Sequence, residues 1–443
     1  MPASPIDSAI YGKLYADAEI GQLFTDSAEV RAMMLVEGAL AKAQGELGLI
    51  PETSAHAIHR AAMELQIDPG GLGASVAMNA VPVPQLVAMF REAMQAPEHA
   101  AFVHWGATSQ DIMDTGLALR LRQALGICDN RLRAAIWSLA DLAEPHAATP
   151  MVARTYGQAA VVTSFGAVVA SWGAPLLRHL DRLDAVRDGA QRVSLSGAAG
   201  TLSAMDGKGT RLRGDLAKAL ALSDPGESWH SARDGIAALS AWMTALCGSL
   251  GKMGEDLMLM TQSGINEVRL TAGGSSSTMP QKSNPVGPSA LSAIARQTVG
   301  LNSVIQSALP HRQQRDATAW MTEWMSLPQI VILTARALTI ADDLARTLSP
   351  DSAAMRRQID STGGMIFAEA LSFALTQKMP RPEAQTQTKA LIETAIQTGT
   401  NLSQVAQEMH PDLDHAKVFS AEHQLGQAPD DAKRFIQIAR TKK

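Results

Sequence analysis

A short stretch at positions 273–285, GGSSSTMPQKSNP, carries residue types from which proton-transfer chemistry could be built. Three serines precede a lysine, and Asn284-Pro285 predicts a helix start, because Asn is a preferred N-cap and Pro suits the first helical position. Since a helix N-terminus carries partial positive charge, Lys282 beside it would favour an anion such as a carboxylate. The glycines and serines suit a loop that closes over that anion. A polar linker with one exposed lysine is the alternative on these residues alone.

Long helices are expected to position this stretch. Apolar residues from Ile236 to Met260 are spaced alternately by three and four, which predicts a long helix in a coiled bundle. Its other faces carry small residues rather than alternating charges, so we expect burial on most sides and a bundle completed by other subunits. Further long helices are predicted over about 118–142 and 291–308. We find no convincing strand pattern.

The composition narrows the classes of function. The chain has 443 residues, 46% of them apolar but only 4% aromatic, which favours closely packed helices in two or three domains. The net charge is −5 and no basic patch is present, so nucleic acid is not an expected partner. We find no signal peptide and no apolar run of the roughly 20 residues that span a bilayer, so a soluble cytoplasmic protein without membrane contact is expected. No residue pattern predicts a metal or another cofactor.

The first stretch also resembles a family signature. It is similar to the GSSxMPxKxNP sequence of the fumarase/aspartase superfamily, although Ser275 stands where the signature has glycine. The resemblance implies that Ser276 is the catalytic serine, and Ser275 and Ser277 stay open as alternatives. The residues in register are Ser276, Ser277, Met279, Pro280, Lys282, Asn284 and Pro285.

Two further segments resemble signature regions of the superfamily. HWGATSQD at 104–111 is similar to the region in which a Thr-Ser pair binds a substrate carboxylate, which implies this role for Thr108 and Ser109. His104 is either a substrate-binding residue or a structural residue of the turn. RTYGQ at 154–158 corresponds to a region where members acting on amino-succinyl substrates usually carry histidine as a general acid, but Tyr156 stands here.

Within the superfamily, the chain resembles the bacterial 3-carboxy-cis,cis-muconate cycloisomerases in particular. The similar segments include LSGAAGTL at 195–202, WHSARDGIA at 229–237 and QRDATAWMTEWMSLPQ at 314–329. The resemblance implies a lactonising cycloisomerase that acts on a small tricarboxylate without a cofactor. It would need no histidine acid, because the group expelled in the reverse reaction is a weakly basic tethered carboxylate.

The resemblance also implies roles for individual residues. Ser276 would donate the proton, while Lys282 and Asn284 would stabilise the charge on an aci-carboxylate intermediate. Arg233-Asp234 and Lys252, at the start and in the middle of a predicted long helix, are expected to form a buried ion pair, with a catalytic role as the alternative. The residues expected to bind the substrate are His104, Thr108, Ser109, Thr155, Gln158, Ser277, Met279 and Arg315.

The implied fold is all-α and fumarase/aspartase-like, with a central long-helix bundle. We expect three domains, at 1–110, 111–351 and 352–443, in a homotetramer whose sites are built from three chains. One alternative function is another lyase of the superfamily, similar to adenylosuccinate lyase, that eliminates an amine or nitrite from a substituted succinate. A non-catalytic helical assembly protein is the other alternative, against which Ser276, Lys282 and Asn284 argue.

Overall fold

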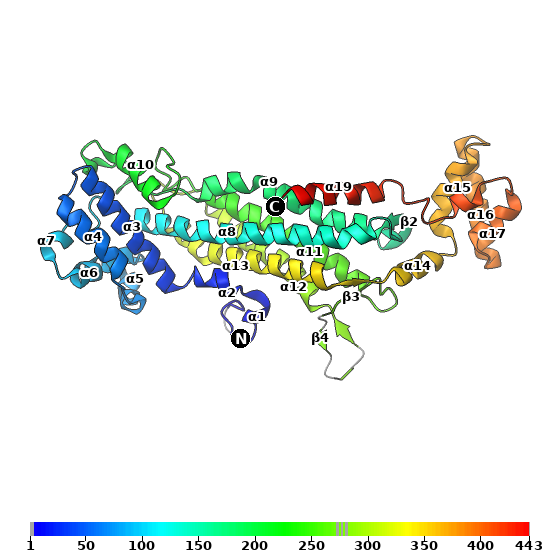
Figure 1. The fold of residues 1–443 in the computed structure, drawn as a ribbon, viewed down its shortest axis with the longest axis horizontal. Coiled ribbons are helices and arrows are strands. Elements are labelled where there is room, and N and C mark those ends of the chain that lie inside the picture. The colour runs from blue at the N-terminus through cyan, green and yellow to red at the C-terminus, as the bar shows by residue number, and fades with distance from the viewer. Residues whose placement is uncertain (1–3, 272–273, 276–277, 280–281, 443) are drawn as a thin grey trace. The chain divides into compact units, whose positions relative to one another are not determined.

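The computed structural model describes residues 4–271, 274–275, 278–279 and 282–442, and helices dominate it (Figure 1). The α-helices are α1 Gly12–Tyr15, α2 Ala18–Gln22, α3 Asp26–Glu46, α4 Glu52–Glu64, α5 Gly73–Asn79, α6 Val83–Met94, α7 Pro97–Ala100, α8 Ser109–Ala143, α9 Phe165–Ala190, α10 Gly209–Leu220, α11 Asp234–Met260, α12 Val286–Ser307, α13 Ala317–Thr347, α14 Ser352–Asp360, α15 Ala368–Leu375, α16 Arg381–Thr398, α17 Leu402–Met409, α18 His415–Val418 and α19 Ala428–Thr441. The predicted long helices are confirmed as α8, α11 and α12.

Contacts along the chain divide it into two compact units. Unit 1 comprises Met1–Asn130, Asp181–Cys247 and Ile294–Arg336, and unit 2 comprises Arg131–Leu180, Gly248–Ala293 and Ala337–Lys443. The three domains predicted from the sequence stay a prediction.

Unit 1 has a core built mainly from α3, α4, α6, α10 and the start of α8. Thr25 caps α3, because its hydroxyl accepts a hydrogen bond from the Ala28 amide at 3.2 Å. α3 and α4 lie side by side (Figure 1) and approach closely at Gly38, where an added Cβ would lie 2.7 Å from Ala62 Cβ. This core supports the segment that leads into α8.

Unit 2 contains a β-hairpin that the sequence analysis missed. β1 (Pro150–Thr155) pairs antiparallel with β2 (Gln158–Ser164). The turn residues Tyr156 and Gly157 have φ values of 51° and 78°, the left-handed pair that a two-residue hairpin turn requires. Two smaller pairs are β3 (Val268–Arg269) with β6 (Ser349–Pro350), and β4 (Gly274–Ser275) with β5 (Ser283–Asn284).

The C-terminal part of unit 2 is a cluster of short helices. α15, α16 and α17 lie together in Figure 1 and share an apolar core that includes Leu371, Leu391 and Leu402. This region is consistent with the short helices expected after position 352.

α13 corrects one expectation from the sequence. It is long and apolar enough to cross a membrane by length and composition, whereas no such run was expected. Because 67% of its most apolar window is buried inside the structure, it has the burial of a core helix.

Candidate active site

The N-terminus of α8 carries two of the predicted substrate-binding residues. Thr108 precedes the helix and Ser109 is its first residue, and both are half-buried. The Asp111 carboxylate accepts a hydrogen bond from the Thr108 amide at 3.0 Å, which closes the first turn as in a capping box. The Thr108 and Ser109 hydroxyls are therefore carried on a rigid turn.

Arg315, another residue predicted to bind the substrate, lies beside this turn. Its Nη1 donates to Thr108 Oγ1 at 2.7 Å, and its Nε donates to Gln110 Oε1 at 3.3 Å. Both acceptors are neutral. In the described residues, no carboxylate forms an ion pair with Arg315. These neutral acceptors do not compensate the positive charge of the guanidinium, which can therefore bind an anion.

The loop before α13 holds Arg315 in place. The Asp316 carboxylate accepts from the Arg312 amide at 3.0 Å, from Arg312 Nε at 2.6 Å and from the Thr318 amide at 3.0 Å. Hydrogen bonds from Arg312 hold the pKa of Asp316 well below its usual range. The loop is thus tied down on both sides of Arg315.

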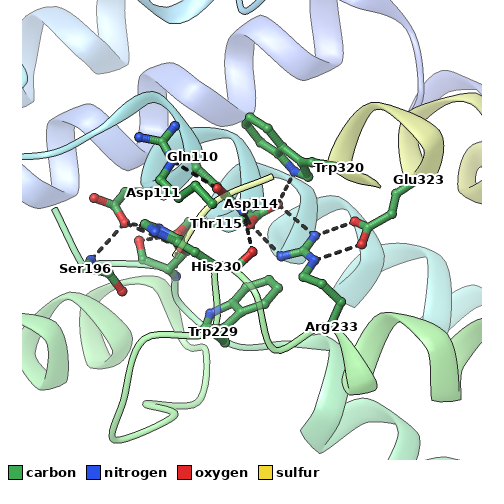
Figure 2. Close-up of polar contacts among 12 residues, drawn as sticks. Gln110, Asp111, Asp114, Thr115, Ser196, Trp229, His230, Arg233, Trp320 and Glu323 are labelled. Atoms are coloured by element: carbon green, nitrogen blue, oxygen red, sulfur yellow. Dashed lines mark hydrogen bonds and ion pairs between the residues drawn. The ribbon is translucent and has the colours of Figure 1, made fainter. Parts of the chain in front are cut away.

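A buried ion triad lies behind the turn (Figure 2). Arg233 Nη1 donates to Asp114 Oδ2 at 2.7 Å and Arg233 Nε donates to Glu323 Oε1 at 2.9 Å, with all three side chains buried. Burial alone would lower the pKa of Arg233, but Asp114 and Glu323 outweigh it and raise that pKa. The predicted buried ion pair is confirmed for Arg233, whose partners are Asp114 and Glu323. It is wrong for Asp234 and Lys252, which are exposed, and Lys252 pairs with Asp256.

Two tryptophans complete the triad (Figure 2). The Arg233 guanidinium lies 4.5 Å from the centre of the Trp229 ring, in a cation–π contact. Trp320 Nε1 donates to Asp114 Oδ1 at 3.1 Å. Two residues of α13 therefore complete the contacts: Trp320 donates a hydrogen bond to Asp114 in the first turns of α8, and Glu323 is a counter-ion of Arg233.

Asp111 joins three segments of unit 1 (Figure 2). Besides the Thr108 amide, its carboxylate accepts from the Ser196 amide at 2.8 Å, the Gly197 amide at 3.0 Å and His230 Nε2 at 2.8 Å. Asp111 and His230 are fully buried. The LSGAAGTL segment is therefore held against the turn at Thr108 by one carboxylate.

His104, which is half-buried, pairs with the buried Glu37 of α3. Its Nδ1 lies 2.7 Å from Glu37 Oε1, and its backbone has a φ of 63°, in the left-handed region. Burial would lower the pKa of His104, but the hydrogen bond and charge of Glu37, with a contribution from Asp111, raise it overall. The imidazole is thus held as a cation over a wider pH range than usual.

Replacing Glu37 with Gln is expected to reverse this pKa shift. Without the carboxylate, burial dominates, and the His104 titration should move from above 6.5 to below 6.5. NMR titration of histidine-labelled protein measures the midpoint. Since the folded pKa is raised, the pair stabilises the fold below about pH 6.5, and this stability is lost as the pH rises through the folded pKa.

The control for this titration is Glu98→Gln. Glu98 is exposed and lies 3.8 Å from His99, away from His104, so the His104 midpoint should not move. An unchanged His104 midpoint in Glu37→Gln would contradict the assignment.

The other predicted residues belong to unit 2. Thr155 and Gln158 are paired at the end of the β1–β2 hairpin, next to the exposed side chain of Tyr156. Arg154 is anchored there by two hydrogen bonds to Glu267, at 3.1 and 3.0 Å. The hairpin therefore presents Thr155 and Gln158 from a fixed base.

The lysine-bearing stretch is described in part. Lys282 and Met279 are exposed, whereas Ser276 and Ser277 lie outside the described residues. Asn284 belongs to β5 and does not cap the helix, because the first helical hydrogen bond runs from the Ser289 amide to the Pro285 carbonyl. The helix therefore starts one residue later than predicted, because Asn284 is part of a strand.

Sequence reasoning missed the buried polar groups that position the turn. Asp111 and Asp114 lie three residues apart in the first turns of a predicted helix, which was the available signal. Their partners, His230 and Arg233, lie more than a hundred residues further along the chain. Among the described residues, no group of three or more histidine, cysteine or acidic side chains is placed to hold a metal ion.

Comparisons with known proteins show which family the chain resembles. A family model described as lyase matches residues 14–300. A 3-carboxy-cis,cis-muconate cycloisomerase of Acinetobacter baylyi is 33% identical, over 98% of this chain and 99% of that protein. An N-acetyl-S-(2-succino)cysteine lyase of Enterococcus italicus is 30% identical, over 87% of this chain and 85% of that protein.

A solved structure shares the whole fold. The crystal structure of the 3-carboxy-cis,cis-muconate lactonizing enzyme from Pseudomonas putida matches with a TM-score of 0.92 and 31% identity, over 98% of this chain and 100% of that chain. The chain therefore belongs to the lyase family of the fumarase/aspartase superfamily.

Proposed function

We propose that the chain is a 3-carboxy-cis,cis-muconate cycloisomerase, which forms 4-carboxymuconolactone in the protocatechuate branch of the β-ketoadipate pathway. The observation that carries this proposal is the full-length similarity to enzymes of that activity, in sequence and in fold. Arg315 supports it, because a guanidinium beside Thr108 that has no carboxylate partner in the described residues suits a substrate with several carboxylates.

The reaction joins two parts of one substrate. A carboxylate oxygen adds to the diene carbon that bears the branching carboxyl group, and a C–O bond forms. The electron pair of the double bond moves to the adjacent carbon and is delocalised into its carboxylate as an aci-form. A proton then adds to that carbon, which completes the lactone without release of any group.

We assign the proton transfer to Ser276, as the superfamily signature implies. A serine is a weak acid unaided, so the proposal requires nearby amides and Lys282 to stabilise its oxyanion. Lys282 and Asn284 would also stabilise the aci-carboxylate where its charge develops. Ser275 and Ser277 remain alternatives for the proton donor.

The proposed substrate-binding residues fall into two groups. Thr108, Ser109 and Arg315 would hold one carboxylate, and His104, whose pKa is raised by Glu37, would add positive charge when it is protonated. Thr155, Gln158, Ser277 and Met279 would contact the remainder of the substrate. The proposal includes a cytoplasmic homotetramer in which three chains build each site.

The test is an ultraviolet assay with 3-carboxy-cis,cis-muconate. We expect a substrate-dependent loss of diene absorbance that needs no added cofactor. Parallel assays with adenylosuccinate, and with fumarate plus ammonia, test the alternative lyase function. Turnover of these and not of the muconate would assign the chain to a succinate-forming or fumarate-forming lyase. No turnover of any would favour the non-catalytic assembly protein.

A further inference from the structure

The Gln110 side chain connects Arg315 to the buried ion triad. It lies in the first turn of α8 and is 2% exposed. Its Nε2 donates to Asp114 Oδ2 at 3.1 Å and to the His230 carbonyl oxygen at 3.0 Å, while its Oε1 accepts from Arg315 Nε at 3.3 Å. Figure 2 shows Gln110 beside Asp114 of the triad.

These contacts allow only one orientation of the amide. Asp114 Oδ2 also accepts from Arg233 and the His230 group is a carbonyl, so both can only accept hydrogen bonds. The amide nitrogen must therefore face them, and the amide oxygen must face Arg315. A reversed amide would place an oxygen against two acceptors and its nitrogen against a guanidinium.

We propose that Gln110 is a positioning residue that holds Arg315 in the pose that binds a substrate carboxylate, without neutralising it. This inference rests on the proposed role of Arg315. Gln110 and Thr108 use Nε and Nη1 of Arg315, one hydrogen bond each. The remaining N–H groups of the guanidinium are free of these two contacts, and its charge has no carboxylate partner in the described residues.

Other side chains at position 110 would disturb Arg315 on one side, or Asp114 and the His230 carbonyl on the other. A carboxylate at 110 would pair with Arg315 and compete with the substrate, and it would also face Asp114. A shorter or apolar side chain would leave the His230 carbonyl without this donor and Arg315 without its second acceptor. The glutamine amide donates to Asp114 and to the His230 carbonyl through its nitrogen, and accepts from Arg315 through its oxygen.

The test uses Gln110→Met in the full-length protein. We measure binding of propane-1,2,3-tricarboxylate by calorimetry, together with KM and kcat for 3-carboxy-cis,cis-muconate. The dissociation constant and KM are expected to rise about tenfold, with kcat changed less than about threefold, because one hydrogen bond to a charged group is lost.

A matched control is Gln306→Met. Gln306 Nε2 likewise donates to a backbone carbonyl, Ala237 O at 3.0 Å, and to a side-chain oxygen four residues away, Asn302 Oδ1 at 3.1 Å. It has no described contact with Arg315, so this variant should lose comparable stability but bind the tricarboxylate as the wild type does.

A double-mutant cycle separates positioning from general destabilisation. In an Arg315→Met background, Gln110→Met should change tricarboxylate binding by less than twofold, because Arg315 is the residue through which Gln110 acts. Equal effects of Gln110→Met with and without Arg315, or an unchanged affinity in the single variant, would overturn the proposal. The binding measurement decides this even if the muconate is not turned over, which would refute only the proposed function.

Gln110→Glu provides a second variant. The new carboxyl faces Asp114, which raises its pKa, and the Arg315 and Arg233 guanidiniums, which lower it. Its protonated form can donate and accept as the amide does, whereas its ionised form pairs with Arg315. Tricarboxylate binding should therefore approach that of the wild type at low pH and weaken as the pH rises. A pH-independent ratio between variant and wild type would contradict the positioning role.

Discussion

Replacing Ser276 with Ala is expected to lower kcat by about 10³-fold, the scale of a lost general acid. The melting temperature should change by less than about 2 °C, because serine-to-alanine removes a single oxygen atom. The kinetics of muconate lactonisation and a thermal melt measure the two quantities. The proposed proton transfer thus predicts a large kinetic effect with little effect on the fold.

Three other serines, Ser275, Ser277 and Ser283, serve as comparisons for Ser276. Ser275→Ala and the exposed Ser283→Ala should keep kcat within about tenfold, and Ser277→Ala should act mainly on KM. If Ser276→Ala retains most of the wild-type rate, the assignment is wrong. If Ser275 or Ser277 shows the large loss of kcat instead, the proton donor is that serine.

Replacing Arg233 with Met is expected to have the largest effect on stability. The change leaves Asp114 and Glu323 buried without their cation, which costs about 3–5 kcal/mol of the free energy of unfolding. Asp114 keeps donors from Trp320 and Gln110, and Glu323 loses both of its short hydrogen bonds to Arg233. Urea unfolding at fixed protein concentration measures the loss.

A surface arginine provides the control for Arg233. Arg60 pairs with Glu64 at 2.9 Å, but both side chains are mostly exposed, so Arg60→Met should cost less than about 1 kcal/mol. Equal losses in the two variants would mean that the buried triad adds no stability of its own. A loss of activity without a loss of stability in Arg233→Met would instead place Arg233 in the chemistry.

The sequence predicts the helices well because their signal is local. The alternation of three and four residues from Ile236 to Met260 sets one face of α11, and the structure has that helix from Asp234 to Met260. The β1–β2 hairpin was missed because its strands are short and lack a strict alternation of apolar and polar residues. The Tyr156-Gly157 turn between them was its clearest local mark.

Site residues could be proposed from the sequence only within segments that resemble those of known family members. Thr108 and Arg315 were both expected to bind a carboxylate, and the structure places them 2.7 Å apart. The network behind them depends on long-range pairs, such as Asp111 with His230, that no spacing rule brings together. The role of such buried charges can be recognised only from the fold, because their partners lie far away in the sequence.

The central claim is that the chain adds a carboxylate to a diene and then delivers one proton to the carbon next to another carboxylate. Proton NMR of the reaction in D₂O tests it most directly. The account predicts a lactone with a single deuterium in the methylene group beside the exocyclic carboxylate, at a rate that the Ser276→Ala variant does not reach. Unchanged muconate, an acyclic product or a lactone without deuterium at that carbon would contradict it.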